Sequence, residues 1–123
     1  GSPHEGKPTL VMMHGYGGSG ALFFKCIKKL CAKFYLVLVD IIGMGGSSRP
    51  DDYPCKTITP GESVDYFVEY FERWRKTMDI SGFYLAGHSF GGYLSGLYAA
   101  KYHQHIKKLL LLSPIGVKTM PPN

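Results

Sequence analysis

The chain alternates short runs of apolar residues with longer stretches in which apolar residues recur every three or four positions. The short runs are residues 9–13, 35–39, 83–86 and 106–112. Unbroken apolar runs of this length are typical of strands that are covered on both faces. Strands that alternate with helices predict a parallel sheet with right-handed crossovers. We therefore expect an α/β fold of three layers, with about four parallel strands and helices on both faces of the sheet.

Two amphipathic helices are predicted between these strands. The first has its apolar side chains at Leu22, Phe23, Ile27, Leu30 and Phe34, with lysines largely on the other side. The second presents Val64, Phe67, Val68, Phe71, Trp74 and Met78. Its start is marked by Thr59 as the cap, Pro60 at the first helical position and Glu62 completing a capping box.

A helix of small residues is predicted after the third strand, over residues 91–100. Gly92, Gly96 and Ala100 stand four residues apart and so share one face of a helix. We expect this face to approach the sheet closely.

Ser89 lies between that strand and that helix, in residues 87–91, which read Gly-His-Ser-Phe-Gly. A serine on a sharp strand-to-helix turn is held in a strained backbone with its hydroxyl exposed above the sheet. Gly87 and Gly91 fit this turn because a Cβ at either position would collide across it. We predict that Ser89 is a nucleophile for acyl transfer, although a chance match is easily reached in a chain with 16 glycines.

A second motif follows the first strand, where residues 14–18 read His-Gly-Tyr-Gly-Gly. Acyl transfer creates an oxyanion that backbone N–H groups stabilise. We expect the oxyanion hole to use the N–H groups of Phe90 and Tyr16, with Gly17 as the alternative to Tyr16. The spacing fits neither a Walker loop nor a dinucleotide fingerprint. No cofactor and no metal are therefore expected.

A catalytic base is not evident among the histidines. His88 adjoins the nucleophile on a tight turn, so its side chain should point away from Ser89, and His14 should support the oxyanion turn by hydrogen bonding. His103 and His105 fall at the opposite end of the sheet and are expected on the surface. Residues 90–123 contain no Asp and no Glu, so no triad acid follows Ser89 in this sequence.

One acidic residue does end a strand near the predicted site. Asp40 follows the second strand but precedes Ser89, whereas this type of turn takes its acid from later in the chain. We expect Asp40 to hold the glycine-rich loop that follows it.

The charge and cysteine content limit the kinds of molecule that this protein is expected to bind. The net charge is +5, and the basic residues are scattered without an aromatic-interleaved stripe, which argues against nucleic acid. Weak attraction to an anionic membrane surface stays open, beside the simpler interpretation of solvated helix faces. Three cysteines without metal spacing favour reduced thiols and an intracellular setting. No run approaches the length of a membrane-spanning helix.

The motifs together resemble those of the α/β-hydrolase family. They are residues 14–17, residues 40–50 (Asp-Ile-Ile-Gly-Met-Gly-Gly-Ser-Ser-Arg-Pro) and residues 87–92. Residues 71–75 and 112–116 are similar to the branch of N-acyl-phospholipid lipases and lipid-droplet lipolysis co-activators. The resemblance implies the third to sixth strands of an eight-stranded sheet. It also implies that the lid, the outer strands, the triad acid and the triad histidine lie elsewhere.

The domain limits follow from this resemblance. Residues 1–8 are interpreted as a tag scar, from the opening Gly-Ser, with a lead-in. Residues 9–123 are expected to form the N-terminal part of one α/β-hydrolase domain.

Two functions remain in view. The parent protein is expected to be a serine hydrolase of carboxylic esters, with lipid or fatty-acyl esters as substrates, and this chain alone is expected to be inactive. The alternative is a truncated or non-catalytic unit that binds a partner, a lipid surface or lipid droplet, or the remainder of its own polypeptide.

Overall fold

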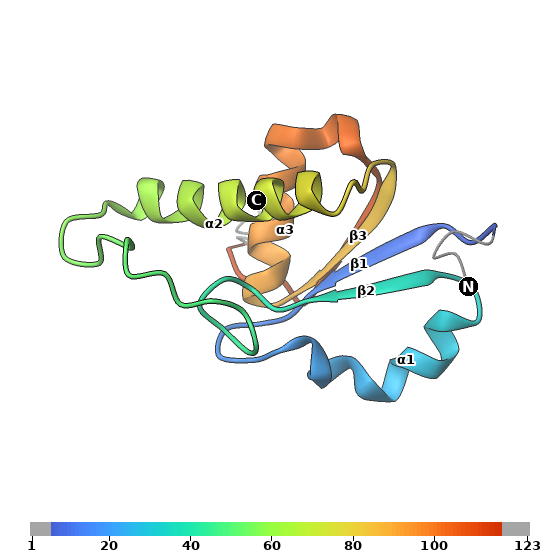
Figure 1. The fold of residues 1–123 in the computed structure, drawn as a ribbon. Helices are drawn as coiled ribbons and strands as arrows, with labels where there is room; N and C mark the ends of the chain where they lie inside the picture. The colour runs from blue at the N-terminus through green and yellow to red at the C-terminus, as the bar shows by residue number, and fades with distance from the viewer. Residues whose placement is uncertain (1–5, 117–123) are drawn as a thin grey trace, which may run out of the picture.

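The computed structural model describes residues 6–116 and shows one parallel sheet flanked by helices (Figure 1). The strands are β1 (Thr9–Met13), β2 (Tyr35–Val39), β3 (Phe83–His88) and β4 (Ile106–Leu112). They lie in the order β2-β1-β3-β4, and every neighbouring pair is parallel. The helices are α1 (Phe24–Cys31), α2 (Pro60–Thr77) and α3 (Phe90–Tyr102), with short 3-10 turns at η1 (Gly20–Phe23) and η2 (His103–His105). The predicted strands are confirmed.

Two apolar clusters cover the two faces of the sheet, which confirms the three-layer prediction. Helices α2 and α3 lie on one face and α1 on the other (Figure 1). Alternate residues of β1 serve the two clusters, because side chains of a strand point to opposite faces in turn. Val11 and Met13 pack with the side of α2 and α3, and Leu10 and Met12 with the side of α1.

The first helix is shorter than its apolar pattern suggests. The segment begins with η1 and becomes α-helical only at Phe24. Ile27, Leu30 and Phe34 are partly buried, but Leu22 is 64% exposed, so its assignment to the apolar face was wrong. A 3-10 turn advances about 120° per residue, which rotates Leu22 away from the face that a regular helix would give it.

The second helix begins where the sequence predicts. Thr59 and Glu62 form a capping box, with Pro60 at the first helical position. Met78 lies just beyond the last helical residue and is 51% exposed, so it does not belong to the apolar face.

The third helix meets the sheet through a different face from the one predicted. Gly91, Leu94, Ser95 and Tyr98 are buried, whereas Ala100 is exposed. A Cβ at Gly96 would meet no atom within 4 Å. Of the predicted stripe of small residues, Gly92 alone makes a close approach, to Gly87 and to residues after β4.

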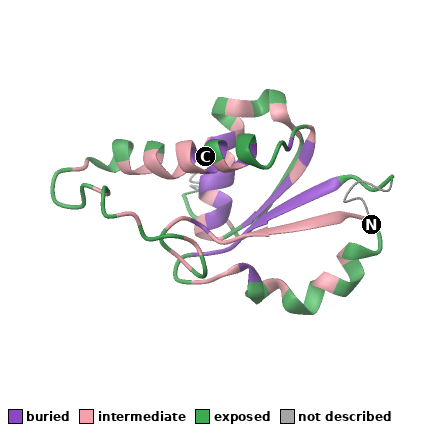
Figure 2. Ribbon diagram, viewed as in Figure 1, coloured by how far each residue is buried: buried purple, intermediate pink, exposed green. Residues whose placement is uncertain are grey.

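Both sheet edges are open among the described residues. All of β2 is half-buried (Figure 2). The four leucines of β4 at 109–112 are each exposed by 38–43%. The two outer strands of a four-stranded parallel sheet have unpaired edges when no further strand pairs with them.

Candidate active site

Ser89 sits on a strained turn between β3 and α3. Its backbone has φ 55° and ψ −117°, a region that a residue with a Cβ rarely adopts. The end of β4 and the residues after it close on this turn, because Ser89 N–H donates to Leu112 O at 3.0 Å and Ile115 N–H donates to Ser89 O at 3.2 Å. The strained geometry predicted for this residue is therefore present, and it is held from both sides.

The two glycines of the motif are required by packing. A Cβ at Gly87 would lie 2.3 Å from Gly91 O, and a Cβ at Gly91 would lie 2.2 Å from His14 O. Real Cβ atoms essentially never come this close to backbone oxygens. The turn is thus packed directly on the end of β1.

The oxyanion-hole donors predicted from the sequence lie beside the serine. The turn after β1 is closed by Gly18 N–H on Gly15 O at 3.1 Å. Tyr16 and Gly17 are the central residues of this turn, and their N–H groups do not form its closing bond. A Cβ at Gly15 would be 3.3 Å from the Ser89 Cβ, which places this turn against the nucleophile.

The second predicted donor, Phe90, is the first residue of α3. The first N–H groups of a helix have no partner within the helix. The ring of Phe90 stands edge-on to that of Tyr16, with centroids 6.2 Å apart. The structure thus brings Tyr16, Ser89 and Phe90 together at the carboxyl end of the sheet, while their catalytic roles stay predictions.

His14 is fixed in one tautomer by its neighbours. Its Nε2 accepts a hydrogen bond from Ile41 N–H at 2.9 Å and therefore carries no proton. Its Nδ1 lies 2.6 Å from Gly15 O and must be the donor there. The ring is fully buried and both nitrogens are occupied, so His14 supports the oxyanion turn, as predicted, and has no free nitrogen to act as a base.

Asp40 holds two loops together, which extends the prediction made for it. Its carboxylate accepts from Gly46 N–H at 2.8 Å, in the glycine-rich loop, and from Gly20 N–H at 2.6 Å, at the start of η1. Ser47 Oγ donates to its backbone oxygen. The bond from Gly20 contributes most to lowering the pKa of Asp40, so the carboxylate stays charged.

The other histidines within residues 6–116 do not complete a triad. His88 is exposed at the end of β3, near Gly15, and its rejection as a base remains a prediction. His103 and His105 lie at the opposite end of the sheet, as expected. His105 departs from the surface assignment, because it is half-buried with its Nδ1 3.3 Å from Ser81 Oγ.

A buried charged cluster between α2 and α3 was missed by the sequence analysis. Arg75 donates two hydrogen bonds to Glu72, at 2.6 and 2.8 Å, and a third to Ile80 O at 2.8 Å. Tyr98 OH donates to Glu72 at 2.6 Å. The hydrogen bonds from Arg75 are the main cause that lowers the pKa of Glu72 to about 2. The spacing of Val68, Glu72 and Arg75 was the available signal, because i, i+4 and i+7 share a helix face.

A buried hydroxyl also lies under the serine turn. Ser95 is fully buried, and its Oγ has no hydrogen-bond partner among residues 6–116. A Cβ at Gly87 would be 2.5 Å from this oxygen. No chemical role follows from this contact.

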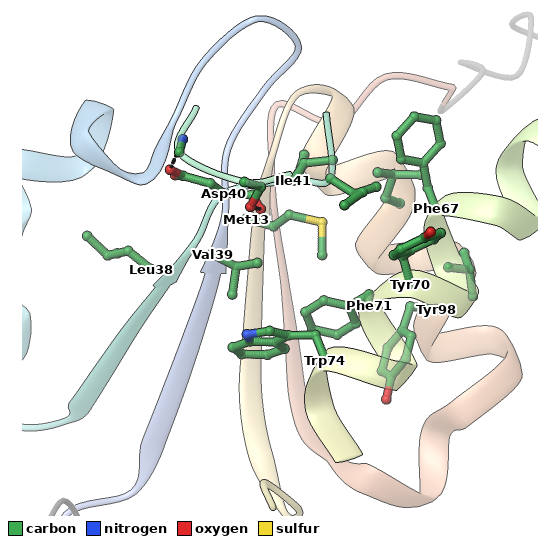
Figure 3. A pocket seen from close by; sticks show the side chains of 15 residues that line it. Met13, Leu38, Val39, Asp40, Ile41, Phe67, Tyr70, Phe71, Trp74 and Tyr98 are labelled. Carbon is green, nitrogen blue, oxygen red and sulfur yellow. Dashed lines mark hydrogen bonds between the residues drawn. The ribbon is translucent and has the colours of Figure 1, made fainter. Parts of the chain in front are cut away.

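An apolar cavity of about 410 Å³ opens between the end of β2 and α2 (Figure 3). Trp74 and Phe71 face Val39 across it, with Asp40 at the rim. Ser89 does not line it, but Phe67 does, and the Phe67 ring packs edge-on against Phe90 at 5.8 Å. The cavity therefore neighbours the candidate site through an aromatic pair.

Residues 6–116 show neither a cluster of metal-binding side chains nor a membrane-spanning helix. Within 6–116, no three His, Cys, Asp or Glu side chains gather as a metal site would need. No helix in this range has the length and apolar character needed to cross a membrane.

Comparison with known proteins places the chain in a family. Residues 8–123 match the model of the alpha/beta hydrolase fold, so the chain belongs to that family. The parallel sheet with helices on both faces and the strained serine turn agree with this family. Within it, the chain is related to a branch of N-acylphosphatidylethanolamine lipases and acylglycerol-phosphate acyltransferases. The resemblance at residues 71–75 and 112–116 had indicated the lipases of this branch, but not the acyltransferases.

Particular relatives define that branch. A probable 1-acylglycerol-3-phosphate O-acyltransferase of Oryza sativa subsp. japonica is 45% identical over 91% of this chain and 26% of its own length. A (lyso)-N-acylphosphatidylethanolamine lipase of Homo sapiens is 40% identical over 99% of this chain and 35% of its own. A solved membrane phospholipase A, described as a bacterial virulence factor, superposes with a TM-score of 0.80 at 26% identity, over 96% of this chain and 36% of that one. The chain thus spans about a quarter to a third of the length of these proteins.

Proposed function

We propose that a polypeptide containing this chain cleaves acyl esters of lipids with Ser89 as the nucleophile. The observation that carries the proposal is the contact between two turns. The strained Ser89 lies against Gly15 of the turn after β1, with Tyr16 next in that turn and Phe90 next after Ser89, and the rings of Tyr16 and Phe90 are in edge-on contact. The relatives named as a lipase and an acyltransferase of lipids support the substrate class.

The proposed reaction begins with the attack of Ser89 Oγ on the ester carbonyl carbon while a base takes its proton. The carbonyl oxygen becomes an oxyanion that accepts hydrogen bonds from Tyr16 N–H and Phe90 N–H. The ester C–O bond then breaks, and the alcohol leaves with the proton that the base held. Water attacks the acyl-serine in the second half, which releases the carboxylic acid and restores Ser89.

A second candidate function differs only in the molecule that accepts the acyl group from Ser89. A lipid hydroxyl in place of water would transfer the acyl group to another lipid, from the same acyl-serine. The relatives described as O-acyltransferases favour this second candidate.

The base and its acid are assigned to polypeptide outside this sequence. His14 has both nitrogens occupied, and residues 90–123 contain neither Asp nor Glu. The chain covers 26% of one of these relatives and 35% of the other, so most of their length lies outside the matched region. The N-terminal part of one hydrolase domain, residues 9–123, is accordingly the proposed identity of this chain. The same absence of an acid favours the alternative, a unit that binds without catalysis.

The test is ester hydrolysis by a polypeptide of the relatives' length that contains this chain. Ser89→Ala should lower the release of fatty acid from a lysophospholipid by about 10³-fold or more. Ser81→Ala is the matched control, because Ser81 is exposed at the opposite end of β3. Full activity in Ser89→Ala would refute the nucleophile, and an inactive parent polypeptide with an intact fold would favour the binding unit.

A further inference from the structure

We propose that the outer surface of η1 and α1 docks this protein on an anionic lipid bilayer, beside the serine turn. The inference goes beyond the proposed function, because it requires no step at Ser89. We call this surface the α1 surface, formed by Leu22, Phe24 and the lysines Lys25, Lys28, Lys29 and Lys33.

The charge of this surface is of one sign. Residues 20–34 contain four lysines and no acidic residue, and all four lysines are exposed. The ion pairs within residues 6–116 join Glu69 and Glu72 to other cations and include no lysine of this segment. The positive charge is therefore not neutralised by the fold.

Helix stability explains only part of this charge. Lys28 and Lys29 stand in the last turn of α1, where a cation is favoured by the helix dipole. Lys25 stands in the first turn, where the same dipole disfavours it. An acidic residue at this position would stabilise the helix. The positive charge of Lys25 is therefore not explained by helix stability, and we take it as a sign of a negatively charged partner outside the fold.

Large apolar side chains are exposed next to these lysines. Leu22 is 64% exposed and Phe24 66% exposed, and Lys25 Nζ lies 5.9 Å from the centre of the Phe24 ring. Apolar side chains flanked by lysines are the pattern of segments that lie in a membrane interface, with the apolar groups among the acyl chains and the cations at the headgroups. This combination favours a lipid bilayer over a soluble acidic protein.

The surface borders the candidate site. A Cβ at Gly18 would be 2.6 Å from Leu22 Cδ1, and Gly15 of the same turn lies against Ser89. Tyr16, at the tip of this turn, is 82% exposed. A bilayer bound to the α1 surface would therefore stand next to the turn that carries the proposed oxyanion donors.

The first test is flotation of the 123-residue chain with phosphatidylcholine vesicles, with and without phosphatidylserine. We expect binding to the mixed vesicles that weakens as salt is added. Lys28→Gln with Lys29→Gln should weaken it about tenfold or more. Lys107→Gln with Lys108→Gln is the matched control, an adjacent exposed pair on β4 with the same change of charge, and should have a much smaller effect.

The apolar part of the surface has its own variants. Leu22→Ser with Phe24→Ser should weaken binding to the mixed vesicles, whereas Met78→Ser, exposed at the far end of α2, should not. Circular dichroism should show the parent helix content in every variant. Ser89→Ala should bind as the parent does, so a failure of the proposed catalysis leaves this result unchanged. Equal binding to neutral and anionic vesicles, or equal effects of the two lysine pairs, would overturn the proposal.

Discussion

The two ends of α3 are fixed to the rest of the molecule by opposite means. At its start, Ser89 and Gly91 are pressed onto the end of β1 with backbone against backbone. Near its other end, Tyr98 reaches a buried ion pair of Glu72 and Arg75. The start tolerates no added atom, while the far end depends on polar groups that are all paired. Helix α3 is therefore held by close backbone packing at its start, where the strained serine turn lies, and by charged hydrogen bonds near its end.

The largest effect should come from breaking the close contact at the serine turn. Gly91→Ala places a Cβ 2.2 Å from His14 O and 2.4 Å from Met13 O, and neither backbone oxygen can move without shifting β1. We expect a loss of about 4 kcal/mol or more in the free energy of unfolding. Urea unfolding followed by the fluorescence of Trp74, which is the single tryptophan, measures it.

Gly96→Ala is the matched control for that change. A Cβ there meets nothing within 4 Å, and an alanine is the better helix former. It should stabilise the chain by about 0.5–1 kcal/mol. Equal destabilisation by the two substitutions would contradict the account of the turn.

The charged end of α3 should give the next largest effect. Glu72→Gln leaves Arg75 buried without its anion, which typically costs about 3 kcal/mol or more. Tyr98→Phe removes one hydrogen bond to the same carboxylate and should cost about 1–3 kcal/mol. The same unfolding assay applies, and a Glu72→Gln chain as stable as the parent would show that the pair contributes nothing net.

The pH dependence of stability isolates the same carboxylate. The pKa of Glu72 is about 2 in the folded chain, against 4.5 as the ordinary value. A lowered pKa gives stability that is complete above pH 4.5 and is lost as the pH falls toward 2. The loss should amount to at most about 3 kcal/mol. Glu72→Gln should flatten this part of the profile, and an unchanged slope would assign the acid sensitivity to other groups.

Asp40 should give the smallest effect of the series. Asp40→Asn removes the charge that accepts from Gly20 and Gly46, and should cost about 1–2 kcal/mol. Asp51→Asn, exposed in the following loop, is the control. Proteolysis in the loop around Gly46 should become faster in Asp40→Asn alone.

How far the sequence predicted the fold depends on whether a feature was local. The strands, the Thr59 cap and the serine turn follow from neighbouring residues, so they could be predicted. Leu22 and Met78 were misassigned because a regular helix was extended past its real ends. The contact of His14 with Ile41 joins distant parts of the chain, and only the fold brings them together.

The buried cluster was missed for a different physical reason. Charged residues on a helix are usually solvated, so Glu72 and Arg75 give no sign of burial unless their partners are known. Tyr98 and Ile80 supply those partners from other elements. The face of α3 that approaches the sheet could not be placed either, because Gly92 and Gly96 differ only in what faces them in the fold.

Intact-mass analysis after treatment with a fluorophosphonate probe shows directly whether Ser89 is the nucleophile. It is applied to a polypeptide of the relatives' length and, in parallel, to this chain alone. We expect one adduct on the longer polypeptide, mapped to Ser89 and lost in Ser89→Ala, and none on the chain alone, in which no histidine is expected to serve as the base. An adduct that persists in Ser89→Ala, or its absence from a folded longer polypeptide, would contradict the assignment of Ser89 as the nucleophile.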